Sequence, residues 1–121
     1  MTTIKSYTDI SQSKRLVEIL PPESADMWWL YVTAQGKYIA MMSEEPDPHY
    51  ITRMKSYGIK DAAIRCWSLA ALLDVCPMVV GRDMDMYCCW HNRKNLCTRH
   101  YDNPIDACYE MIIKLHESNL L

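Results

Sequence analysis

A run of six apolar residues at positions 27–32 (MWWLYV) is the feature that most constrains the fold. Its aromatic and β-branched side chains favour a short strand. Gly36 supplies a turn, and residues 38–42 can return as the antiparallel partner. Successive side chains of a strand point to opposite faces, so Trp28 and Trp29 should lie on opposite faces of this hairpin. One apolar face can meet a core, and the other needs a cover, either another element or another molecule.

Three segments have helical patterns. Residues 9–20 are amphipathic and stop at a pair of prolines, whereas residues 66–76 are apolar almost all the way round and belong in the middle of a domain. The clearest helix follows Asn103, which we expect to be its N-cap, with Pro104 at the first helical position. All three helices are expected to pack against a sheet.

A second hairpin is expected from residues 84–91 and 96–101, which flank the turn-like stretch at 92–95 (NRKN). Residues 78–80 can add a short strand before it. Residues 43–65 are the least regular part of the chain.

Within this segment we expect a short strand at residues 49–54 and a mobile or irregular remainder. The fold class that follows is α+β, with a mainly antiparallel sheet of about four strands in two hairpins, packed with three helices. A single domain spanning residues 1–121 is expected, because the length fits one domain.

Charge and composition exclude several classes of function. The formal net charge is −2, which argues against long nucleic acid as a partner, because such binding depends on a basic surface. The N-terminus has no basic segment followed by an apolar one, and no stretch approaches the ~18–20 apolar residues that cross a bilayer. We therefore expect a cytoplasmic protein without membrane contact, in which the six cysteines are reduced.

Three stretches share a resemblance with known sequences: residues 6–27 (SYTDISQSKRLVEILPPESADM), 66–77 (CWSLAALLDVCP) and 103–121 (NPIDACYEMIIKLHESNLL). Together they resemble a group of short uncharacterised proteins from gut bacteria of the Bacteroides type and from their phages and mobile elements. The resemblance covers somewhat under half of the chain. It implies a cytosolic, phage or mobile-element setting, where small proteins often act by binding host proteins or signals.

The sharpest metal-like pattern is a pair of C-x-x-H motifs, Cys88 with His91 and Cys97 with His100. They offer the four nitrogen and sulfur ligands that zinc prefers. Only five residues separate His91 from Cys97, however, whereas familiar zinc modules place about a dozen between ligand pairs. Residues three apart on a strand also point to opposite faces. Buried thiols and histidines at the rim are the favoured interpretation, and no metal or other cofactor is expected.

A basic and aromatic stretch offers a second candidate site. Tyr50 and Tyr57 alternate with basic residues that can meet phosphates while the rings stack on bases. The basic residues are Arg53, Lys55, Lys60 and Arg65, and the same argument applies to Arg93, Lys94 and Arg99. A solvated segment of mixed charge is the favoured interpretation, and a small nucleotide is the alternative ligand.

Catalytic motifs are lacking. Cys66 precedes a predicted helix and could use His49 as a base, but a structural thiol is the favoured interpretation. No phosphate-binding glycine loop, nucleophile elbow or HExxH motif occurs. We therefore expect no enzymatic activity. The leading hypothesis is a protein that binds another protein, or a second copy of itself, through Trp28 or Trp29 on the outer face of the first hairpin.

Overall fold

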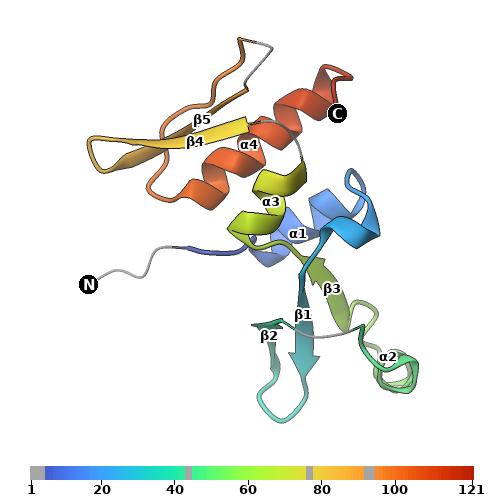
Figure 1. Cartoon of the computed structure of the whole chain (residues 1–121). Helices are drawn as coiled ribbons and strands as arrows, with labels where there is room; N and C mark the ends of the chain where they lie inside the picture. Colours follow the sequence, from blue (N-terminus) through green and yellow to red (C-terminus); the bar gives the residue numbers. More distant parts are fainter. Residues whose placement is uncertain (1–4, 43–44, 76–77, 92–94) are drawn as a thin grey trace. The chain divides into compact units, whose positions relative to one another are not determined.

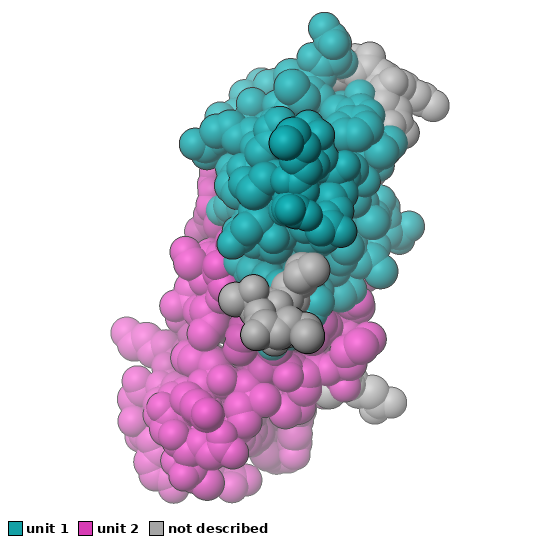
Figure 2. Space-filling model, turned by 90° about the vertical axis from the view of Figure 1, so that its left-hand side faces the viewer, with its two compact units in different colours: residues 1–8, 67–121 teal, residues 9–66 magenta. Residues whose placement is uncertain are grey.

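The computed structural model describes four segments of the chain, residues 5–42, 45–75, 78–91 and 95–121 (Figure 1). These segments contain four α-helices and two antiparallel sheets, so the expected α+β class is confirmed. Two compact units are distinguished in Figure 2, one formed by residues 9–66 and the other by residues 1–8 with 67–121. We call them the first and second unit, and the assignment to a single domain stays a prediction.

The first unit contains a three-stranded antiparallel sheet of order β2-β1-β3 (Figure 1). Its strands are β1 (Met27–Val32), β2 (Lys37–Met41) and β3 (Ala63–Cys66). The first two form the expected hairpin, and Gly36 takes a φ of 64° in its turn. β3 was not expected, because four residues with an arginine among them give too short a pattern to stand out.

Helix α1 (Ile10–Val17) begins where the sequence indicates. Asp9 is its N-cap: its carboxylate accepts from the Gln12 backbone N–H at 2.7 Å, and the Gln12 side chain accepts from the Asp9 backbone N–H at 3.1 Å. This reciprocal capping box satisfies two backbone donors at the helix start. Leu16 is completely buried, and α1 packs against β3.

The strand expected at residues 49–54 is wrong, because this stretch lies within helix α2 (Pro48–Ser56). The Asp47 carboxylate accepts from the His49 backbone N–H at 3.0 Å, and Pro48 occupies the first turn. An N-cap followed by proline is a helix start that outweighs the weak strand preference of tyrosine and isoleucine. The part of residues 43–65 that the structure describes is thus more regular than expected.

The second unit contains the two-stranded sheet of β4 (Met78–Asp83) and β5 (Met86–His91). The regular ladder differs from the expected one: β5 turns back onto β4 through Met84 and Asp85, whose φ angles are 48° and 67°. Two successive positive φ angles are typical of a type I′ turn. Methionine seldom adopts this conformation, so the sequence does not predict the turn.

The segment expected to pair with β5 does lie beside it, but through isolated bridges. Tyr87 pairs with Tyr101 and Trp90 with Cys97, so that two residues of β5 stand opposite three of the flanking segment. Such an offset is a β-bulge. Here the Thr98 hydroxyl accepts from the Cys89 backbone N–H at 2.9 Å and so takes the place of a carbonyl.

Two helices complete the second unit, α3 (Leu69–Val75) and α4 (Pro104–Glu117). α3 is shorter than the helix expected at residues 66–76, and the Ser68 hydroxyl accepts from the Ala71 backbone N–H at 3.2 Å. α4 starts as expected, with the Asn103 side chain accepting from the Asp106 backbone N–H at 2.9 Å. Seven of its 14 residues are buried: Pro104, Ile105, Ala107, Cys108, Met111, Ile112 and Leu115. This helix packs against β5, β4 and α3 and forms the core of the unit.

Candidate binding groove at the edge of the first sheet

The two faces of the β2-β1-β3 sheet differ in burial. Residues that pair across antiparallel strands share a face. The covered face includes Met27, Ile64 and Cys66, which are all buried. The open face has no fully buried side chain and carries Trp28, Leu30, Ile39, Met41, Ala63 and Arg65.

Trp28 and Arg65 form a cross-strand pair on the open face. The Arg65 guanidinium carbon lies 5.1 Å from the centroid of the Trp28 ring, within the range of a cation–π contact. No carboxylate in the described part of the chain forms an ion pair with Arg65. The positive charge is therefore held in place by an aromatic ring, with its hydrogen-bonding groups available.

The direction in which each residue of β3 points its backbone N–H and C=O groups follows from a hydrogen bond to β1. The Tyr31 N–H donates to the Ala62 carbonyl oxygen at 2.8 Å, which makes these two residues a hydrogen-bonded pair. Backbone groups alternate in direction along a strand, so Ile64 also directs its N–H and C=O toward β1. Ala63 and Arg65 then direct theirs away from β1. Because β3 is an outer strand of this sheet, these groups lie along an edge with which no other strand of the described segments pairs.

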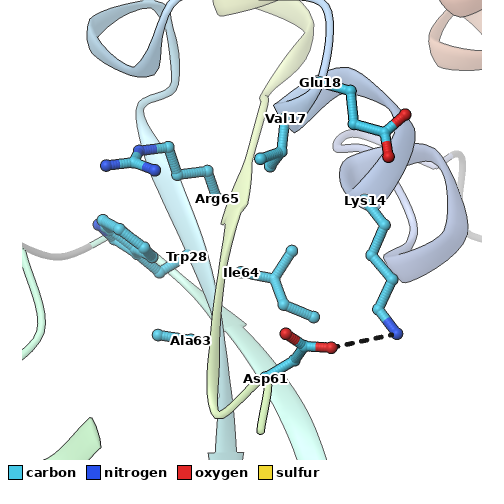
Figure 3. A pocket seen from close by; sticks show the side chains of 8 residues that line it. All are labelled: Lys14, Val17, Glu18, Trp28, Asp61, Ala63, Ile64 and Arg65. Carbon is cyan, nitrogen blue, oxygen red and sulfur yellow. Dashed lines mark ion pairs between the residues drawn. The ribbon is translucent and has the colours of Figure 1, made fainter.

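An open pocket of about 240 Å³ lies along this edge, between β3 and α1 (Figure 3). Its walls are Lys14, Val17 and Glu18 of α1, Ala63, Ile64 and Arg65 of β3, and Trp28 and Asp61. We call this the groove. Sites for drug-sized ligands measure about 300–1,000 Å³, so the groove suits a side chain or a short piece of chain better than a whole nucleotide.

The charged residues of the groove are not equally available. Lys14 Nζ lies 3.9 Å from Asp61 Oδ2, the ion pair drawn in Figure 3. Glu18 accepts from the Arg15 guanidinium at 3.1 Å. Both acidic residues thus face a cation already, whereas the interaction found for Arg65 among the described residues is the one with the Trp28 ring. An incoming anion would meet its complement at Arg65.

The tryptophans lie as the alternation predicts, on opposite faces of β1. Trp28 lines the groove, and Trp29 belongs to the face that includes Ile64. Arg65 was assigned to the basic and tyrosine-rich stretch, but the structure places it beside Trp28 instead.

The remaining residues of that stretch are on α2. Tyr50, Arg53 and the C-terminal cap Tyr57 are spaced i, i+3 and i+7, so they follow one side of the helix. Tyr57 is 69% exposed. One ligand could therefore contact all three side chains. The expected nucleotide binding stays a prediction.

The two C-x-x-H pairs are not assembled into one cluster. Cys88 and His91 pair with Gly81 and Met78 of β4, so they point to opposite faces of the sheet. His100 Nε2 lies 3.6 Å from Asp83 Oδ2. Within the described segments, no three His, Cys, Asp or Glu side chains are grouped closely enough to hold a metal ion.

The remaining candidate site residues include Cys66 and Arg99, whose contacts are explained by the fold. Cys66 is completely buried at the end of β3. The Arg99 guanidinium donates to Glu110 at 2.9 Å and to the Tyr101 hydroxyl at 3.1 Å, so it is engaged within its own unit. Arg93 and Lys94 lie outside the described residues.

One exposed apolar surface was missed. Val79, Met86 and Trp90 share the outer face of β4 and β5 and are 40%, 37% and 41% exposed. A Cβ added at Gly81 would lie 2.6 Å from the Trp90 ring, so the ring rests on the glycine. Val79 and Gly81 lie on the same face of β4 as Trp90 of β5. This pattern would have indicated the exposed face if the pairing of β4 with β5 had been predicted.

Comparisons with protein-family models, with curated proteins and with solved structures gave no match to this chain. None of the helices that the structure describes is long and apolar enough to cross a membrane.

Proposed function

We propose that this protein is a non-enzymatic binding module that recognises a partner protein through the groove and the open face beside it. The observation that carries the proposal is the Trp28–Arg65 pair, which lies at the groove with no carboxylate of the described segments paired to its guanidinium. Tryptophan and arginine are the residue types most enriched among the residues that dominate protein interfaces. An aromatic ring that already positions the guanidinium lowers the entropy lost on binding.

The open face supports the same proposal. Leu30, Ile39 and Met41 continue from Trp28 across the sheet, and all are partly exposed. Partial exposure of several neighbouring apolar side chains is more typical of an interaction surface than of scattered surface residues. We further propose a cytoplasmic setting and a phage or mobile-element origin, in which such a module would act on a host protein.

Site-specific photocrosslinking in the cells that produce the protein tests this function. A photoreactive residue in place of Val17, in the groove, should yield an adduct with a defined partner. The same residue in place of Glu23, which is exposed and outside the groove, is the matched control. Arg65→Glu should abolish the Val17 adduct. Equal adducts at both positions, or an adduct that Arg65→Glu leaves unchanged, would contradict the proposal.

A small-nucleotide binder is the second candidate, favoured by the alignment of Tyr50, Arg53 and Tyr57 on one side of α2. A nucleotide at 100 times its Kd should stabilise the protein by about 2.7 kcal/mol, which a thermal shift would detect. The shift should disappear in Arg53→Ala. Silence across a panel of nucleotides would remove this candidate and leave the groove unaffected.

A further inference from the structure

The free edge of β3 has the geometry to accept another strand. The N–H and C=O groups of Ala63 and Arg65 point away from β1, and α1 stands beside them across the groove (Figure 3). Unpaired edge groups are a template for strand addition, a common mode of peptide recognition. Main-chain bonds then give affinity, while alternate side chains give specificity.

The register of an added strand determines which of its side chains lie on the open face and which point toward α1. A residue opposite Arg65 shares the open face with the guanidinium. Its neighbour, opposite Ile64, points to the other face, toward Val17 of α1. An acidic side chain therefore complements the first position, because Arg65 has no acidic partner among residues 5–42, 45–75, 78–91 and 95–121. A small apolar side chain complements the second, which is walled by Ile64 and Val17.

We propose that the groove binds an extended segment of a partner protein that pairs with β3 as a fourth strand, with an acidic residue opposite Arg65 and an adjacent apolar residue opposite Ile64. This inference rests on the proposed function and specifies its partner. The complex would form a four-stranded sheet of order β2-β1-β3-peptide. Charge complementarity selects the segment: a basic residue opposite Arg65 would place like charges side by side, which destabilises a strand pair.

A peptide fits this edge better than a second copy of the chain. Two copies that paired through β3 would be related by a twofold axis perpendicular to the sheet. Each copy would then bring its own α1 to the same side of the joined sheets, where the groove of about 240 Å³ offers room for a short piece of chain. A single extended segment has no such helix to accommodate.

Residue-resolved amide hydrogen exchange of the full chain with short blocked peptides tests the inference. The probe is a peptide of β-branched residues with Glu-Val at its centre. One control has Lys-Val there, and the other has Glu-Val-Pro, because a proline opposite Ala63 removes an N–H that would point toward β3. At saturation, the Glu-Val peptide should slow exchange at the Ala63 and Arg65 amides more than about tenfold. It should bind about fivefold more tightly than the Lys-Val peptide, and the Glu-Val-Pro peptide should give no protection.

A charge reversal on the protein sharpens the test. Arg65→Glu should invert the preference, so that the Lys-Val peptide binds more tightly, and Arg65→Gln should remove the preference while retaining the protection. Thermal unfolding of each variant verifies that it is folded. No protection by any peptide, or equal affinity for the Glu-Val and Lys-Val peptides, would overturn the inference. Protection that appears with protein concentration alone would also overturn it, by identifying a second copy as the occupant.

The two proposals fail separately. If the peptides give no protection but the Val17 crosslink persists and depends on Arg65, strand addition is refuted and partner binding stands. If the crosslink is also absent, the proposed function falls as well.

Discussion

The two units differ in how completely their helices cover their sheets. In the second unit, α4 buries seven of its 14 residues and packs on β5, and Met78 and Cys89 are buried on the inner face of the hairpin. In the first unit, α1 buries two residues and α2 buries one. A long, capped, amphipathic helix thus completes a core, whereas two short helices leave much of a three-stranded sheet partly exposed. The second unit therefore has the larger set of buried residues, and the groove lies in the first unit.

The difference in burial between the two units implies a difference in how much their apolar residues stabilise the fold. Burial of apolar surface stabilises by about 25 cal/mol per Å², so partly exposed residues such as Leu30 contribute less to folding than Ile112 does. Retaining apolar residues where they stabilise little is expected of a surface that is buried by a partner.

Truncation of matched apolar side chains should separate the two units. Ile112→Ala in α4 removes a completely buried side chain and should lower the free energy of unfolding by about 2–5 kcal/mol. Leu30→Ala, on the open face, should cost less than about half of that, because Leu30 is partly exposed. Urea unfolding followed by circular dichroism measures both. Equal costs would refute the difference in coverage.

The bulge beside β5 should depend on one hydroxyl. Thr98→Val keeps the shape of the side chain but leaves the buried Cys89 N–H without its acceptor, and should cost about 1–3 kcal/mol. Thr98→Ser retains the hydroxyl and serves as the control. If the valine variant is as stable as the serine variant, the hydroxyl does not hold the flanking segment to β5.

The helix cap in the second unit should contribute more to the free energy of unfolding than the helix cap in the first unit. Asn103→Ala removes a buried cap whose amide also donates to Asp106 Oδ2 at 2.8 Å, and should cost about 1–2 kcal/mol. Asp9→Ala removes an exposed cap and should cost about 0.5–1 kcal/mol. Thermal unfolding of the two variants gives the comparison. A larger cost at Asp9 would show that α1 contributes more to stability than its burial indicates.

The smallest effect concerns acid sensitivity. Desolvation alone would raise the pKa of Glu110, but hydrogen bonds from the Arg99 backbone and guanidinium outweigh it and hold this pKa below the usual value. A carboxylate with a lowered folded pKa stabilises above its unfolded pKa, and this contribution is lost as the pH falls through the folded value. Glu110→Gln should therefore flatten the loss of stability below about pH 4.5.

The matched variant in the first unit is Asp61→Asn. Its ion pair with Lys14 is long, at 3.9 Å, and both side chains are largely exposed, so the substitution should leave stability almost unchanged. Denaturant unfolding at pH 3–7 measures both variants. Parallel stability profiles for wild type and Glu110→Gln would contradict the role of Glu110.

Local signals predicted much of the fold. The helix start near Asp9, the cap at Asn103 and the turn at Gly36 are readable because each rests on neighbouring residues. The turn at Met84 and Asp85 is not, since methionine seldom adopts a positive φ, although aspartate tolerates one.

The same distinction applies to the groove. Strand alternation identified Trp28 as a surface candidate, but its partner Arg65 became apparent only with β3, whose four residues gain their conformation from pairing with β1. The free backbone edge depends on that pairing phase, which no sequence pattern encodes. Asp47, the N-cap of α2, stands before a proline, which is a readable helix start, although we expected a strand at residues 49–54.

The most direct test of the central claim is hydrogen exchange of the free protein, read at the successive amides of β3. The account predicts that the Ile64 and Cys66 amides, which point toward β1, are protected, and that those of Ala63 and Arg65 exchange more than about tenfold faster. Such an alternation would establish a free edge beside the groove. Uniform protection of all four amides would mean that the edge is already occupied and would contradict the account.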